Sequence, residues 1–200
     1  MASLSKVEQD NAMELVLRLM REINSLKKKP SVEQFFQSDE GQHLLKFSIQ
    51  ASLKKQGSRR NNMIAKLTAS GMVQSVYAYS VLDFIDMVSE LNEPELNLLM
   101  TAYELYDKKD SIGKERKDSL VAPDIKTWTE LHARFPEIPP IEMVALFIRM
   151  QRTGLVQRAQ GFMDDSGDTF EFTPILKKLI DYANLDRESV DETLSPTNSQ

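Results

Sequence analysis

Helical spacing of apolar residues, interrupted at intervals by helix-ending signals, constrains the fold of this chain more than any other feature. Apolar residues recur three or four positions apart along most of the 200 residues, and that spacing places them on one face of an α-helix. Prolines, glycines and polar capping residues divide the chain into segments of helical length. We therefore predict a mainly α-helical protein.

The first predicted helix spans residues 5–27. Its apolar stripe consists of Val7, Met13, Val16, Leu17, Met20 and Ile23. Leu15, Leu19 and Leu26 widen that face. Three lysines and a proline follow at 27–30 and are typical of a helix end, because cations suit the C-terminal dipole and proline blocks continuation. Such a stripe predicts packing on the domain core or pairing with a second copy.

Further helices are predicted in the rest of the front region, residues 1–77. Leu45, Ile49 and Leu53 share one side of a helix that Ser38 or Asp39 caps. A Gly-Ser pair at 57–58 ends or bends that helix, and the next one, 59–69, is closed by a Ser-Gly pair at 70–71. The sequence therefore predicts a helical front region.

Residues 78–184 predict a second module. An apolar stripe at 81–91 is followed by Asn92 and Glu95, a capping pair for the next helix, and by a charged loop at 107–119. Another stripe at 125–135, a proline turn and a helix from Ile141 to Thr153 come next, with Gly154 as the helix stop. Two short strands and a final helix complete the module, and the polar tail at 185–200 is expected to be disordered.

The order of these elements over residues 92–184 resembles a winged helix-turn-helix domain. The matching pieces are Gly154-Leu155-Val156 after the third helix and the segment from Phe170 to Pro174 after the hairpin. The resemblance implies that the helix from Ile141 is the recognition helix and the hairpin is the wing. We expect a helical N-terminal half packed on a winged-helix-like C-terminal module with one small β-hairpin.

A second resemblance is to bacterial proteins of the abortive-infection alpha type, which are linked to phage defence. It is carried by Arg59-Arg60-Asn61, by the helix pair at 81–103 and by Thr173-Pro174. It implies a role in phage–host conflict. It assigns no catalytic or binding residue.

Charge is unevenly distributed along the chain. Residues 1–77 carry 12 Lys and Arg against 7 Asp and Glu, whereas the remainder carries 13 against 23, for a net charge of −5. The basic front suits a phosphate-bearing partner and the acidic back does not, because nucleic-acid binding depends on phosphate neutralisation. The alternative is that the asymmetry reflects solubility alone.

The best candidate for binding nucleic acid or another anion is the basic segment, residues 54–66. Its polar members are Lys54, Lys55, Arg59, Arg60, Asn62 and Lys66. Arg59, Asn62 and Lys66 share one helix face, and the helix N-terminus would add free N–H groups for an anion. The alternative interpretation is a solvated basic helix face.

The predicted recognition helix favours protein over DNA. Met143, Leu146, Phe147 and Met150 form one apolar face, additional to a face that contains Ile141 and Ile148. A helix that is apolar nearly all round lacks the polar and cationic groups that read bases, and the hairpin carries four acidic residues. The four residues from Met143 to Met150 therefore predict a protein interface or a tightly packed core.

No catalytic or metal constellation is recognisable. Cysteine is absent and His43 and His132 are the two histidines. His132 shares an apolar face with Trp128, which is typical of a packed histidine. The Asp-rich turn at 164–168 lacks the calcium-loop spacing, so we predict a hairpin turn rather than a metal site. We expect no cofactor and no enzymatic activity, with a cryptic effector enzyme as a distant alternative.

These observations predict a cytoplasmic interaction or regulatory protein. The N-terminus leads into a charged amphipathic stretch, and no uncharged run reaches the roughly 18–20 residues that span a bilayer. The main hypothesis is a protein that binds a partner protein or a second copy. The alternative is a nucleic-acid-binding transcriptional regulator that uses the basic segment.

Overall fold

The computed structural model describes residues 5–26, 32–73, 78–110, 125–158 and 170–184. In chain order these residues form α1 (Lys6–Asn24), α2 (Val32–Gln37), α3 (Asp39–Leu53), α4 (Ser58–Val73), α5 (Ala78–Glu90), α6 (Glu93–Asp110), α7 (Ile125–Arg134), α8 (Pro140–Met150), the 3-10 turn η1 (Gln151–Thr153), β1 (Val156–Arg158), β2 (Phe170–Phe172) and α9 (Pro174–Ala183). Strands β1 and β2 pair antiparallel, with Val156 opposite Phe172. The prediction of a mainly helical chain with one small hairpin is confirmed.

Several helices begin at caps supplied by their own sequence. Ser5 and Glu8 form a capping box at the start of α1, and Ser38 caps α3. The predicted Asn92–Glu95 pair is also present: the Glu95 N–H donates to Asn92 Oδ1 and the Asn92 N–H donates to Glu95 Oε2, each over 2.9 Å. These reciprocal bonds satisfy N–H groups that a helix start would otherwise leave unpaired.

Some predicted helix boundaries differ from the structure. Residues 70 and 71 do not close α4, which continues to Val73. Gly71 instead serves helix packing, because a Cβ at that position would lie 2.9 Å from Leu44 Cδ2 and 3.2 Å from Val81 Cγ1. Residues 107–110 belong to α6 rather than to the predicted loop at 107–119. Gly154 ends its helical segment as predicted, with φ at +72°, although the last turn, Gln151–Thr153, is 3-10 rather than α. The rest of that loop, the 164–168 turn and the 185–200 tail lie outside the described residues.

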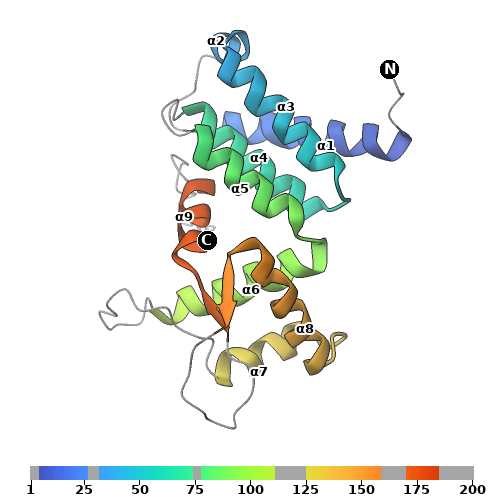
Figure 1. Ribbon diagram of the computed structural model, residues 1–200, viewed down its shortest axis with the longest axis vertical. Helices are drawn as coiled ribbons and strands as arrows, with labels where there is room; N and C mark the ends of the chain where they lie inside the picture. Colours follow the sequence, from blue (N-terminus) through green and yellow to red (C-terminus); the bar gives the residue numbers. More distant parts are fainter. Residues whose placement is uncertain (1–4, 27–31, 74–77, 111–124, 159–169, 185–200) are drawn as a thin grey trace, which may run out of the picture.

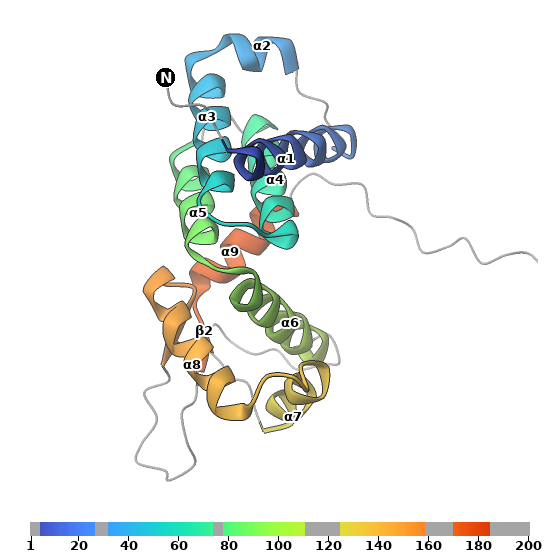
Figure 2. The ribbon, with the colours of Figure 1, turned by 90° about the vertical axis from the view of Figure 1, so that its right-hand side faces the viewer.

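Helices α1 to α5 form one end of the molecule (Figures 1 and 2), and α6 to α8 with the hairpin form the other. At the first end, α1 lies across the outside of the other helices and packs on α4. Helix α3 packs on α4 through small residues, where Ser48 Oγ and Thr68 Oγ1 are 2.7 Å apart. Small side chains let the two helix backbones approach closely.

The other end is built on packed aromatic rings. The Phe147 ring of α8 lies 5.3 Å from both the Trp128 ring of α7 and the Phe170 ring of β2. Ring pairs at such separations contribute stability beyond that gained from burying their apolar surface. Phe172 packs edge-on against Tyr103 of α6 in the same way. The hairpin is therefore held against all three helices of this end.

Helix α9 returns from the hairpin to the first end. It packs against α4, and the Tyr182 ring lies 6.0 Å from the Phe84 ring of α5. Burial raises the pKa of the Tyr182 phenol to about 12. The helix that the sequence groups with the second module thus covers part of the front region (Figure 1).

Candidate interaction surfaces

The first lysines of the basic segment are already paired within the molecule. Lys54 donates to Asp86 Oδ1 over 2.9 Å and to Glu90 Oε1 over 3.3 Å. The hydrogen bond to Asp86 is the main reason that the pKa of Lys54 is raised. Lys55 donates to the backbone carbonyl of Glu90. Both lysines therefore join the front region to the end of α5.

The N-terminus of α4 holds an anion that the chain itself supplies. Glu93, the first residue of α6, accepts from the Arg59 N–H over 2.7 Å and from the Arg60 N–H over 3.3 Å. Gly57 permits this approach, because a Cβ at that position would collide with the Glu93 carboxylate. The N–H groups that we expected to be free for an external anion are therefore occupied.

The remaining basic side chains are also engaged or withdrawn from solvent. Arg59 forms an ion pair with Glu104 over 3.1 Å. Arg60 is 0% exposed, and burial lowers its pKa, an effect that the nearby Glu93 charge partly offsets. Burial, and to a lesser degree the charge of Arg59, lower the pKa of Lys66. Arg60 therefore has no exposed surface with which to bind a phosphate, and its prediction as an anion-binding residue is wrong. Asn62 is half-buried.

The Arg60 side chain donates one hydrogen bond to the described residues, from Nη2 to the Ser52 carbonyl over 3.3 Å. Its Nε and Nη1 atoms have no partner within the part of the chain that the structure describes. A buried cation of this kind depends on the opposite charge nearest to it, since desolvation is expensive. Glu93 supplies that charge while it caps α4.

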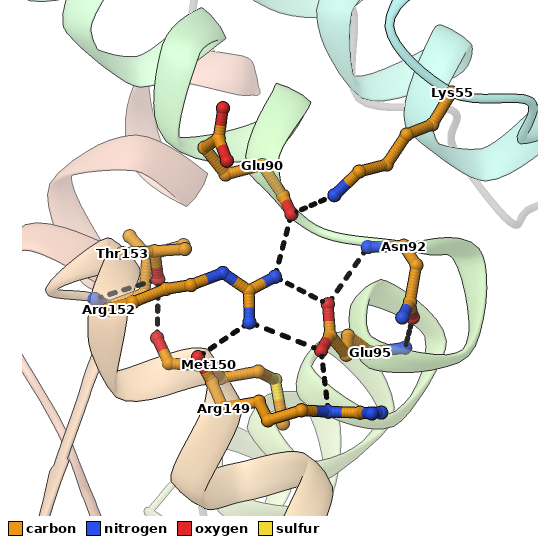
Figure 3. Close-up of polar contacts among 9 residues, drawn as sticks. Lys55, Glu90, Asn92, Glu95, Arg149, Met150, Arg152 and Thr153 are labelled. Carbon is orange, nitrogen blue, oxygen red and sulfur yellow. Dashed lines mark hydrogen bonds and ion pairs between the residues drawn. The ribbon is translucent and has the colours of Figure 1, made fainter.

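A second carboxylate at the start of α6 binds α8 and η1 (Figure 3). Glu95 is 1% exposed and forms ion pairs with Arg149 over 3.2 Å and with Arg152 over 3.0 Å. Arg152 also donates to the carbonyls of Arg149 and Glu90, each over 2.7 Å. Burial would raise the pKa of Glu95, but hydrogen bonds from Arg152 and Asn92 outweigh it and lower the pKa.

The four residues proposed as a protein interface on α8 lie in the core. Met143, Phe147 and Met150 are 0% exposed and Leu146 is 4% exposed. Their burial corrects the expectation that they face a partner and agrees with the alternative of a packed core. The face that contains Ile141, Ala145 and Ile148 is exposed instead, at 81% for Ile141 and 50% for Ile148.

Helix α1 shows the same exchange of faces. Leu15, Leu19 and Ile23 are buried, whereas the residues predicted to lead its core-facing stripe are exposed. The exposed residues are Val7, Met13, Val16, Leu17 and Met20. Of the predicted stripe only Ile23 is buried, and the residues expected to widen it, Leu15, Leu19 and Leu26, supply the rest of the core-facing side.

The two histidines do not form a site. His43 is exposed beside Phe47, and His132 stacks on Trp128 with ring centroids 6.1 Å apart, as its apolar neighbours predict. Within the described ranges no three His, Asp or Glu residues converge as metal ligands.

A shallow depression on α3 is lined by Leu45, Ile49 and their polar neighbours. No helix in the described parts is long and apolar enough to cross a membrane.

No protein-family model, curated protein or solved structure matches this chain.

Proposed function

We propose that this protein is a non-enzymatic interaction or regulatory protein that docks another polypeptide through the exposed face of α8. The observation that carries the proposal is the exposure of Ile141 and Ile148 on a helix whose opposite face is fully packed. Isolated apolar side chains on a surface are ordinary, but Ile141, Ala145 and Ile148 recur at helical spacing and form one stripe. A stripe of this kind suits the groove or helix of a partner protein.

The proposal places α8 in a winged-helix-like module. Helices α6, α7 and α8 are followed by an antiparallel hairpin, which is the element order of that architecture. In such a module α8 occupies the position of the recognition helix. Fold alone does not decide what a module binds, so the chemistry of the exposed face carries the choice.

The polar groups around α8 favour polypeptide over nucleic acid. Arg149 and Arg152, the cations closest to the exposed face, are paired with Glu95, and Glu142 lies exposed beside Ile141. Duplex recognition needs donors for base edges and free cations for phosphates. The basic segment is paired with Asp86, Glu90, Glu93 and Glu104, which also argues against nucleic acid as its ligand. A role in phage–host conflict rests on the sequence resemblance alone.

Affinity purification with quantitative mass spectrometry tests the proposal. A protein captured by the wild type from lysate of the source cells should fall at least about tenfold with Ile141→Asp/Ile148→Asp, because desolvating two carboxylates opposes docking. Ile175→Asp, at an exposed apolar position on α9, is the matched control and should retain capture. Equal capture by the double variant would contradict the proposal, as would tight, salt-sensitive binding of random DNA in fluorescence anisotropy.

A further inference from the structure

Helix α1 has two apolar faces, and α4 covers one of them. On the opposite face Met13 is 61%, Val16 36%, Leu17 50% and Met20 58% exposed. These four residues, the α1 stripe, follow the spacing i, i+3, i+4, i+7 of a continuous helix seam. Helix α1 is 19 residues long, or about 28 Å at the usual rise. The α1 stripe occupies its middle and C-terminal parts.

Two unpaired charges lie on one edge of the α1 stripe. Asp10 and Arg21 are exposed, eleven positions or about three turns apart, on the side where Leu17 lies. Neither side chain has a hydrogen bond or ion pair within the described residues. The neighbouring Glu14 and Arg18 differ, because they bind each other over 2.8 Å. One edge of the stripe therefore carries a free acid near one end and a free base near the other.

We propose that α1 packs antiparallel on α1 of a second copy of this chain. A twofold axis between Val16 and Leu17 places Met13 against Met20 of the second copy, and Met20 against its Met13. In an antiparallel pair the same edge of each helix meets, so Asp10 comes within about half a turn of Arg21 of the second copy, twice over. The α1 stripe and its charged edge are thus self-complementary.

Other occupants fit the charges less well. A parallel pairing brings opposite edges together and leaves Asp10 and Arg21 apart. An anionic membrane surface favours an excess of cations along the polar edge, whereas this edge carries two acids, Asp10 and Glu14, with two bases, Arg18 and Arg21. A single helix pair buries less than the roughly 1,600 Å² of a standard interface, so we expect a dissociation constant in the micromolar range.

Sedimentation velocity over a concentration series up to about 300 µM measures this dimer. Leu17→Glu should raise its dissociation constant by about 100-fold or more, because two buried leucines are lost and two carboxylates are brought together. Ile148→Glu is the matched control on α8 and should leave the dimer unchanged. Circular dichroism verifies that both variants are folded. A wild type that stays monomeric, or a dimer that persists in Leu17→Glu, would overturn the proposal.

Charge exchange tests the antiparallel register. Asp10→Arg should weaken the dimer several-fold, because each Arg21 then faces an arginine of the second copy. Asp10→Arg/Arg21→Asp restores opposite charges in both pairs and should recover most of the affinity. A double variant as weak as the single one would overturn this pairing. The inference is independent of partner docking by α8, since Ile148→Glu affects that docking and Leu17→Glu affects the dimer.

Discussion

The N-termini of α4 and α6 are both capped by glutamates, yet one cap is local and the other comes from a distant part of the chain. Helix α6 is capped by Asn92 with Glu95, three residues apart. Helix α4 is capped by Glu93, which lies 34 residues after Arg59. A local cap determines where a helix begins, whereas a remote cap also determines which helices meet. Because Glu93 binds the N-terminus of α4 while Glu95 binds Arg149 of α8 and Arg152 of η1, the start of α6 joins the two ends of the molecule.

Removal of Glu95 should have the largest effect of the changes at the start of α6. We expect Glu95→Ala to lower the free energy of unfolding by about 3 kcal/mol, because it removes a buried carboxylate that pairs with two arginines and completes the cap of α6. The value lies at the low end for buried pairs, since both arginines are partly exposed. Urea denaturation measures it. Glu104→Ala removes an exposed ion pair and should cost about 0.5 kcal/mol; equal losses would contradict the assignment.

The remote cap of α4 should be worth more than a local cap side chain. We expect Glu93→Ala to cost about 2 kcal/mol, because two N–H groups lose their acceptor and buried Arg60 loses its nearest opposite charge. Asn92→Ala removes a single cap acceptor and should cost about 1 kcal/mol. Urea denaturation of both variants makes the comparison. A smaller loss for Glu93→Ala than for Asn92→Ala would show that the remote contact contributes little.

The smallest expected effect is a pH dependence carried by Glu95. Its pKa in the folded protein lies below the ordinary 4.5. A lowered folded-state pKa contributes stability above the unfolded-state pKa, and the contribution is lost as pH falls through the folded value. The stability difference between wild type and Glu95→Gln should therefore be constant near neutral pH and shrink below about pH 4.5. Urea denaturation at several pH values measures it, and a difference that grows on acidification would contradict this sign.

The local features of the fold could be predicted from sequence. Asn92 with Glu95 identifies a helix start, Gly154 a helix end, and the apolar spacing identifies the helices, because each signal depends on neighbours within a few residues. The core-facing sides of α1 and α8 could not be predicted. Both helices are apolar on two faces, and the position of a distant helix such as α4 decides which face is buried.

The basic segment shows the same limit of prediction from sequence, here for a candidate binding site. Its charges and helix start are visible in the sequence, and they suit an external anion. Its counter-charges are separated from it by about 30 to 45 residues, as for Arg59 with Glu104. The excess of acid in the back half is the one available signal, because opposite charges on two packed regions can neutralise each other.

The position of α9 has a consequence for how the protein is made. A ribosome synthesises the front helices first, but α4 lacks part of its native cover until α9 has been added. Translation at about 5–20 residues per second delays that cover by several seconds. Nascent chains shorter than about 184 residues therefore expose apolar surface of α4, and chaperones that recognise such surface gain a period in which to bind.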